Sequence, residues 1–138
     1  MKSVGIIAEY NPFHNGHAYQ LQKAKEASGA DFAVAVMSGD FVQRGEPAMF
    51  EKRLRARWAL ENGADMVIAL PTPFALASAE AFALGGVTLL SKSGIADSIA
   101  FGSECGDTDI LCRAADILSD EPDELKALIK SNISRGLS

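Results

Sequence analysis

Cysteine and long apolar runs are both scarce in this sequence. Two cysteines in 138 residues, Cys105 and Cys112, are too few for a disulfide scaffold, which indicates a reducing compartment. No uninterrupted apolar stretch reaches the roughly 20 residues that a membrane span needs. The apolar run near the N-terminus ends at Glu9, which is too early for a signal peptide. We therefore expect a soluble, cytoplasmic protein with no membrane partner.

An excess of positive charge is missing as well. The sequence carries 13 basic and 18 acidic side chains, which argues against a general, charge-driven nucleic-acid binder. The imbalance is local, because residues 1–62 hold eight basic and seven acidic groups, whereas residues 63–138 hold five and eleven. Any polyanion should therefore meet the first half. With 48% apolar and 22% charged residues, neither disorder nor a coiled coil fits.

Two familiar nucleotide motifs are absent, since the sequence has neither a Gly-Lys pair for a Walker loop nor a GxGxxG pattern. Short apolar runs instead alternate with helical segments along the chain. We predict strands at 4–8, 32–37, 66–70 and 97–101, and helices at 15–28, 50–61, 75–90, 108–118 and 122–133. This alternation predicts one α/β domain, with a parallel sheet and helices on both faces.

The segment most informative about chemistry runs from Ile7 to His17, between the first strand and the first helix. His14 and His17 are three residues apart, so both project from one side of the first helical turn, and Gly16 leaves room for a ligand near the backbone. A helix N-terminus at the carboxyl end of a strand favours phosphate. The alternatives are two surface histidines or half of a zinc site. No other histidine exists and the cysteines lie far away, so we predict no bound metal.

The HxGH tetrapeptide His14-Asn15-Gly16-His17 resembles the signature of the nucleotidyltransferase superfamily related to class I aminoacyl-tRNA synthetases. Three longer strings, at residues 8–17, 38–48 and 101–104, resemble the bacterial tRNA(Met) cytidine acetate ligase family. The resemblance runs along residues 1–138. It implies a Rossmann-like nucleotidyltransferase fold with strand order 3-2-1-4-5.

The resemblance also implies an activity. The enzyme would use ATP, with Mg²⁺, to activate acetate as acetyl-adenylate, and would pass the acetyl group to N4 of the wobble cytidine of elongator tRNA(Met). His14 and His17 would be the catalytic residues. The family's ATP-binding positions fall on Ile7, Ala8, Glu9, Tyr10, Asn11, Pro12, Phe13, His14, Asn15, Gly16, His17, Ala18, Tyr19, Gln20 and Gly102. Without the resemblance, Gly102 reads equally well as a plain turn after a strand.

Members of that family are much longer, and the resemblance implies further nucleotide-binding residues and most of the tRNA-binding surface beyond residue 138. We therefore expect this sequence to be the N-terminal part of a longer architecture. Two alternatives stay open. One is a small-molecule adenylyltransferase of the same superfamily, and the other is a nucleotide- or tRNA-binding module that is inactive without the rest.

Several further residues have weaker signals. Asp40, Arg44, Ser103 and Glu104 are candidate phosphate or tRNA contacts, although Asp40 reads almost equally as a turn residue. The basic segment 52–57 is expected to be a solvated helix face with an ion pair between Glu51 and Arg55. Six large apolar residues are expected in the core rather than on a base-stacking surface: Leu54, Trp58, Leu60, Phe74, Phe82 and Leu89.

Overall fold

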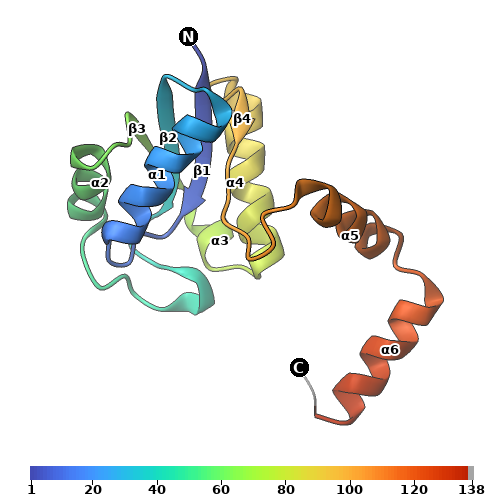
Figure 1. Ribbon diagram of the computed structural model, residues 1–138. Coiled ribbons are helices and arrows are strands. Elements are labelled where there is room, and N and C mark those ends of the chain that lie inside the picture. Colours follow the sequence, from blue (N-terminus) through green and yellow to red (C-terminus); the bar gives the residue numbers. More distant parts are fainter. Residues whose placement is uncertain (137–138) are drawn as a thin grey trace. The chain divides into compact units, whose positions relative to one another are not determined.

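The structure is a computed structural model that describes residues 1–136, except for the side chain of Arg44. The chain divides into two compact units, Met1–Gly102 and Ser103–Ser138 (Figure 1). Among the described residues, no helix is both long and apolar enough to cross a membrane.

The first unit is a parallel sheet covered by helices, as the sequence predicted (Figure 1). Its elements are β1 (Ser3–Ala8), α1 (Asn15–Ser28), β2 (Phe32–Ser38), the 3₁₀ turn η1 (Gln43–Gly45), α2 (Lys52–Glu61), β3 (Met66–Leu70), α3 (Thr72–Ala75), α4 (Ala79–Ser93) and β4 (Ser98–Ile99). The strand order is β3-β2-β1-β4 and every pairing is parallel. β1 therefore lies between β2 and β4, which places the carboxyl ends of β1 and β4 side by side.

Alternate residues of the strands build an apolar core on each face of the sheet. On one face, Leu21 and Ala24 of α1 and Ala59 of α2 pack against side chains such as Ile6. On the other, Leu90 of α4 belongs to a second cluster, with Val34, Val36, Leu70 and Ala75. Successive side chains of a strand point to opposite faces of the sheet, so a strand that is buried on both faces contributes to both clusters.

Glycines let α4 lie close against β1. A Cβ atom on Gly86 of α4 would lie 2.7 Å from Cδ1 of Ile7, and one on Gly5 of β1 would lie 2.6 Å from Cδ1 of Leu90. Both distances are shorter than non-bonded carbon atoms tolerate. The missing side chains therefore set the spacing between the helix and the strand that leads to the HxGH segment.

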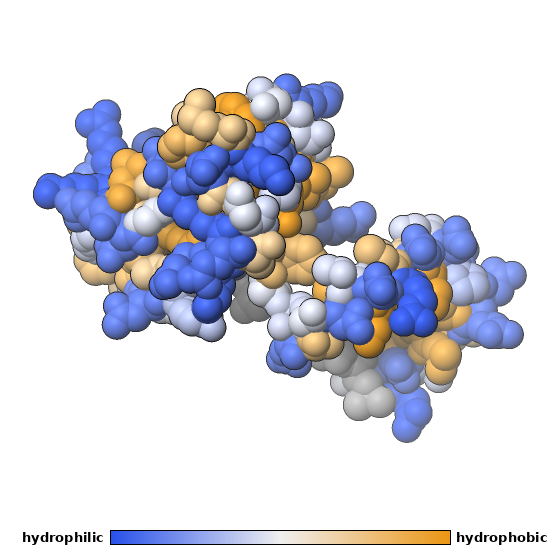
Figure 2. Space-filling view, turned by 45° about the horizontal axis from the view of Figure 1, so that its top comes forward, coloured by the Kyte–Doolittle hydropathy of each residue, from blue (hydrophilic) through white to orange (hydrophobic). Residues whose placement is uncertain are grey.

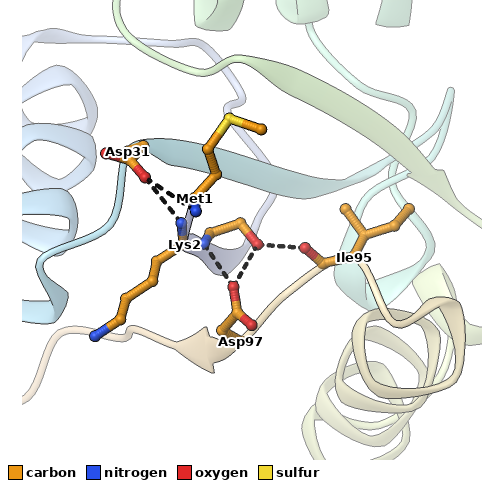
Figure 3. Close-up of polar contacts among 6 residues, drawn as sticks. Met1, Lys2, Asp31, Ile95 and Asp97 are labelled. Atoms are coloured by element: carbon orange, nitrogen blue, oxygen red, sulfur yellow. Dashed lines mark hydrogen bonds and ion pairs between the residues drawn. The ribbon is translucent and has the colours of Figure 1, made fainter.

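Each of the strands β2, β3 and β4 is preceded by an aspartate that clamps it to a neighbouring strand. The aspartate N–H donates to a backbone carbonyl of one residue, and the carboxylate accepts from the N–H of that same residue, at distances between 2.8 and 3.0 Å. The three pairs are Asp31 with Lys2, Asp65 with Ala33 and Asp97 with Ser3. Figure 3 shows the two pairs that hold the start of β1. These clamps fix the register of the sheet at its amino end.

Two predicted elements differ from the structure. The single helix expected over residues 75–90 is interrupted, because Ser78 accepts from the N–H of Ala81 and starts α4 anew after α3. The last turn extends to Ser93, and Gly94 ends it in the left-handed conformation. The strand expected over residues 97–101 is only Ser98–Ile99, because it pairs with just two residues of β1.

The expectations for the core were right in part. Phe82 and Leu89 pack against the second apolar cluster. Leu60 and Phe74 were wrongly placed in the core, since they are 47% and 41% exposed. Leu60 points away from the sheet because Ala59 takes the buried position of α2, and the ring of Phe74 lies over Gly85 at the protein surface.

The second unit consists of α5 (Thr108–Asp120) and α6 (Asp123–Ser134), close to the predicted bounds. Asp107 begins α5, since its carboxylate accepts from the N–H groups of Asp109 and Ile110. Both helices expose large apolar side chains, and Figure 2 shows apolar residues among the polar ones on the visible face of this unit. The most exposed are Ile110, Ile117, Leu118, Leu128, Ile129 and Ile133.

Candidate active site

The two histidines of the HxGH segment cap α1. His14 is the N-cap residue, and its Nδ1 accepts from the N–H of Gly16 at 3.1 Å. The N–H of His14 in turn donates to Nδ1 of His17 at 3.2 Å. The arrangement is a capping box in which imidazoles take the usual places of a hydroxyl and a carboxylate.

This capping box fixes what the rings offer to a ligand. Because Nδ1 of each ring accepts a backbone N–H, the proton of the neutral ring lies on Nε2. The rings are stacked, with their centroids 3.7 Å apart and their planes inclined by 22°. Partial burial, and secondarily the charge of His14, lowers the pKa of His17, which favours its neutral form. The pair thus presents two Nε2–H donors at a helix N-terminus, an arrangement suited to an anion.

Tyr10 packs against the ring of His17. It is fully buried, adopts a positive φ of 49°, and its ring lies edge-on to those of Phe13 and His17, each at 4.9 Å. Burial raises the pKa of Tyr10 to about 12, so the phenol stays neutral. Its hydroxyl has no hydrogen-bond partner among the described residues. Tyr10 therefore serves as packing that orients the ring of His17.

Two hollows meet at the histidines. One, of about 400 Å³, is lined by residues 7–12 together with His14, His17 and Gln20. The other, of about 510 Å³, lies between α1 and the segment after β4 and is lined on that side by Ala100, Phe101 and Gly102. The strand order thus brings His14 and Gly102 to one hollow. A Cβ on Gly102 would meet no protein atom within 4 Å, so its backbone is open to a ligand.

Arg55 holds the loops around the site together, and sequence reasoning missed it. Its guanidinium is fully buried and donates to carbonyl oxygens from three segments. Nε donates to Phe50 at 2.9 Å, Nη1 to Glu9 at 2.5 Å, and Nη2 to Ser38 at 3.2 Å and to Gly39. Burial lowers the pKa of Arg55, while the nearby carboxylates of Asp40 and Glu9 oppose that effect.

The predicted ion pair between Glu51 and Arg55 was therefore wrong. Arg55 lies four residues before the buried Ala59, on the inward side of α2, and its side chain reaches the backbone beneath the helix. That spacing was the available signal, but the identity of the acceptors depends on segments distant in sequence. The other three basic residues of the helix, Lys52, Arg53 and Arg57, are exposed, as expected.

Two side chains between β1 and the HxGH tetrapeptide also bind the loop after β2. A carboxylate oxygen of Glu9 accepts from the N–H of Gln43 at 2.6 Å, and Oδ1 of Asn11 accepts from the N–H of Met49 at 2.7 Å. With Arg55, they make residues 9–13 and 39–51 one connected structure. Glu9 and Asn11 thus shape the site through the loop as well as lining the hollow themselves.

The remaining candidates lie in different places. Asp40 bonds to Lys52 at 2.7 Å and to neither histidine, whose Nδ1 atoms are held by backbone. Arg44 lies in η1, but its side chain is outside the described part of the structure. Ser103 and Glu104 belong to the second unit, where the hydroxyl of Ser103 accepts from Gly106. Their contacts with a ligand stay predictions.

A parallel sheet in the order 3-2-1-4, with paired histidines at the helix start after its first strand, defines the chain as a nucleotidyltransferase fold. The HIGH Nucleotidyl Transferase family matches residues 1–138, and the chain belongs to it. The resemblance seen in the sequence is thereby confirmed.

The relatives make the comparison more specific. The chain is 54% identical to the tRNA(Met) cytidine acetate ligase of Acetivibrio thermocellus and 50% identical to that of Halothermothrix orenii, over all of this chain and 33% of each relative. A crystal structure of Thermotoga maritima TmcAL bound with alpha-thio ATP superposes with a TM-score of 0.87 at 46% identity, over 100% of this chain and 33% of that one. The chain therefore spans about a third of the length of the relatives it matches.

Proposed function

We propose that this chain is the ATP-binding domain of a tRNA(Met) cytidine acetate ligase. The observation that carries the proposal is the pair of Nε2–H donors that His14 and His17 present at the start of α1. Two findings on similar proteins support it: the relatives bear that enzyme's name, and the Thermotoga maritima structure contains an ATP analogue.

The reaction would run in two steps. A carboxylate oxygen of acetate attacks the α-phosphorus of ATP, the bond to the β-phosphate oxygen breaks, and pyrophosphate leaves with the electron pair. N4 of the wobble cytidine of elongator tRNA(Met) then attacks the acetyl carbon, loses a proton and releases AMP. No covalent bond to the enzyme is needed, so the protein contributes orientation and charge stabilisation.

The residues divide these tasks between them. His14 and His17 would donate to phosphate oxygens, where negative charge grows in the transition state, and the N-terminus of α1 would add its dipole. Residues 7–13, Asn15, Gly16 and residues 18–20 would form the rest of the cradle, with the open backbone of Gly102 against the ribose or base. Of these, residues 7–12, Gly16, Tyr19 and Gln20 line the two hollows at the histidines.

Mg²⁺ would arrive bound to the phosphates of ATP. Among residues 1–136 no group of three or more His, Cys, Asp or Glu side chains is placed to hold a metal ion. A hydrated Mg²⁺ that is carried by the nucleotide would need no such set of protein ligands. Its charge would neutralise the leaving pyrophosphate.

Substitution of the histidines tests the proposal in the full-length protein. His14→Asn keeps a residue that caps helices well but removes Nε2–H, and His17→Ala removes the second donor. Loss of one such donor costs about 100-fold or more in rate, so acetate-dependent ATP–pyrophosphate exchange should fall by at least that factor in each variant. Circular dichroism and the melting temperature serve as controls for folding. Normal exchange in both variants would refute the proposed role.

The exchange assay and a binding measurement separate the two alternatives. A requirement for phosphopantetheine or a mononucleotide in place of acetate identifies a small-molecule adenylyltransferase. ATP and tRNA binding by the 138-residue chain without product identifies a binding module that needs the remainder of the protein.

A further inference from the structure

A third hollow opens on the other side of His14. It measures about 420 Å³, and one wall is the turn over residues 12–15. The opposite wall is formed by Phe50, Trp58 and Asn62, from the start of α2 and its exposed side. This aromatic hollow shares His14 with the two hollows described above, so a group bound in it lies next to any ligand of the histidine pair.

The lining of the aromatic hollow suits a flat heterocycle. Phe50 and Trp58 stand edge-to-face, with ring centroids 5.1 Å apart, and Phe50 is 40% exposed. Phe13 adds a third ring from the wall that is formed by the turn over residues 12–15. Aromatic faces at the surface are what single-stranded nucleic acids use for base stacking. Acetate, with two carbons, would leave most of this space empty.

The charge of α2 favours a polyanion beside the aromatic hollow. Residues 50–61 carry four basic and two acidic side chains in a chain whose net charge is −5, and three of the basic ones are exposed, whereas Arg55 is buried. Arg53 is exposed, and Lys52 and Arg57 are held only by exposed ion pairs, with Asp40 and Glu61. Such pairs are weak and exchange readily for phosphate. The helix that supplies Trp58 therefore also carries exposed side chains of the kind that contact a nucleic-acid backbone.

We propose that the aromatic hollow binds the acceptor base, an unstacked cytosine of single-stranded RNA, between the turn at His14 and the rings of Phe50 and Trp58. The inference rests on the proposed function, since it places the acceptor on one side of His14 and ATP on the other. Trp58, expected in the core, is half-buried and lines the aromatic hollow.

Binding of an anticodon stem-loop to the full-length protein tests this placement. Two RNAs are compared, one with cytidine at the wobble position and one with an abasic nucleotide there. Stacking of one base on an aromatic side chain corresponds to about fivefold in affinity or more, so the abasic RNA should bind the unaltered protein weaker by that factor. In Phe50→Leu, cytidine RNA should bind weaker and the abasic penalty should largely vanish.

The control is Phe32→Leu. Phe32 is 41% exposed, like Phe50, but begins β2 at the amino end of the sheet, so this variant should keep the full abasic penalty. An equal penalty in Phe50→Leu and the unaltered protein overturns the inference. If Phe50→Leu only damaged the structure, the binding of both RNAs would weaken together and the abasic penalty would stay intact. That result would also overturn the inference.

Tryptophan emission gives a second readout that separates the base of the RNA from the adenine of ATP. Trp58 is the single tryptophan of the 138-residue sequence. Its emission is obtained by subtracting the spectrum of the Trp58→Phe variant from that of the unaltered full-length protein. This difference should change with the cytidine RNA and not with ATP alone. A response to ATP alone would place adenine in the hollow and overturn the inference. Acetate-dependent ATP–pyrophosphate exchange needs no RNA. A protein without that exchange activity would therefore refute the proposed function independently of the RNA-binding results.

Discussion

At the scale of single residues, one arginine and two histidines organise the candidate site. The histidines are held by backbone N–H groups, and Arg55 holds backbone carbonyls of the surrounding loops. The conformation of the site is thus fixed largely by contacts between side chains and backbone. Such contacts leave the Nε2–H groups available for a ligand.

Replacing Arg55 should be costly. Arg55→Met removes the donors and leaves the carbonyl groups of Glu9, Ser38, Gly39 and Phe50 without their partner, so the free energy of unfolding should fall by about 3 kcal/mol. Urea denaturation measures the change. Arg53→Met, on the exposed side of the same helix, should change stability by less than about 0.5 kcal/mol. Equal stability of the two variants would contradict this role of Arg55.

The two kinds of residue differ in how far sequence predicts them. His14 and His17 could be identified because their spacing and their position before a helix are local features. Arg55 could not, because its acceptors lie up to 46 residues away and a charged residue on a helix is ordinarily solvated. Side chains whose partners depend on tertiary structure are beyond a reading of one sequence.

At the scale of elements, the aspartate clamps set how the strands meet. Asp65 illustrates the chemistry: its carboxylate accepts from the N–H of Ala33 and pairs with Lys25 at 2.6 Å. Partial burial alone would raise the pKa of Asp65, but the hydrogen bonds from Lys25 and Ala33 and the charge of Lys25 lower it below 3.8. The ionised form is therefore the one that stabilises the fold.

The pH dependence of stability follows from this lowered pKa. Asp65→Ala should lower the free energy of unfolding by about 1 kcal/mol at pH 7, because the carboxylate is partly exposed. The folded state binds the proton less tightly than the unfolded chain. The stabilisation is therefore full above pH 3.8 and disappears as the pH falls through the lowered pKa.

The free energies of unfolding of the unaltered protein and of Asp65→Ala should approach each other as the pH falls. Urea denaturation of both proteins between pH 7 and pH 3 measures this. Asp116→Ala, on an exposed position of α5, is the control and should leave stability nearly unchanged at every pH. A difference between Asp65→Ala and the unaltered protein that persists undiminished at pH 3 would show that ionisation is not the cause.

The elements themselves could be predicted in type and order from apolar spacing. Their ends were less predictable where a cap or a pairing decides them. Ser78 restarts a helix because its hydroxyl finds an N–H, and β4 stops at Ile99 because its pairing with β1 ends there. Neither cause leaves a signal in the apolar pattern.

At the scale of the whole molecule, both apolar cores lie in the first unit, among residues 4–90. The boundary after Gly102 was not predictable, because α5 and α6 have the same apolar spacing as helices that pack on a sheet. Periodicity shows which side of a helix is apolar but not which surface covers it.

A shortened chain, residues 1–102, should therefore fold on its own. We expect a single cooperative thermal transition within a few degrees of that of the 138-residue chain, because both cores are retained. Calorimetry and circular dichroism measure it. An unfolded or molten product would show that the first unit depends on residues 103–138.

The three aspartate clamps have a consequence far from where they act. Each clamp joins an aspartate to one residue at the start of the neighbouring strand through two hydrogen bonds. A strand that slipped by one residue would break both bonds and move its carboxyl end by about 3.3 Å relative to its neighbour. The aspartates at one end of the sheet thus keep the start of α1, with its two histidines, aligned with the loop after β2 at the other end.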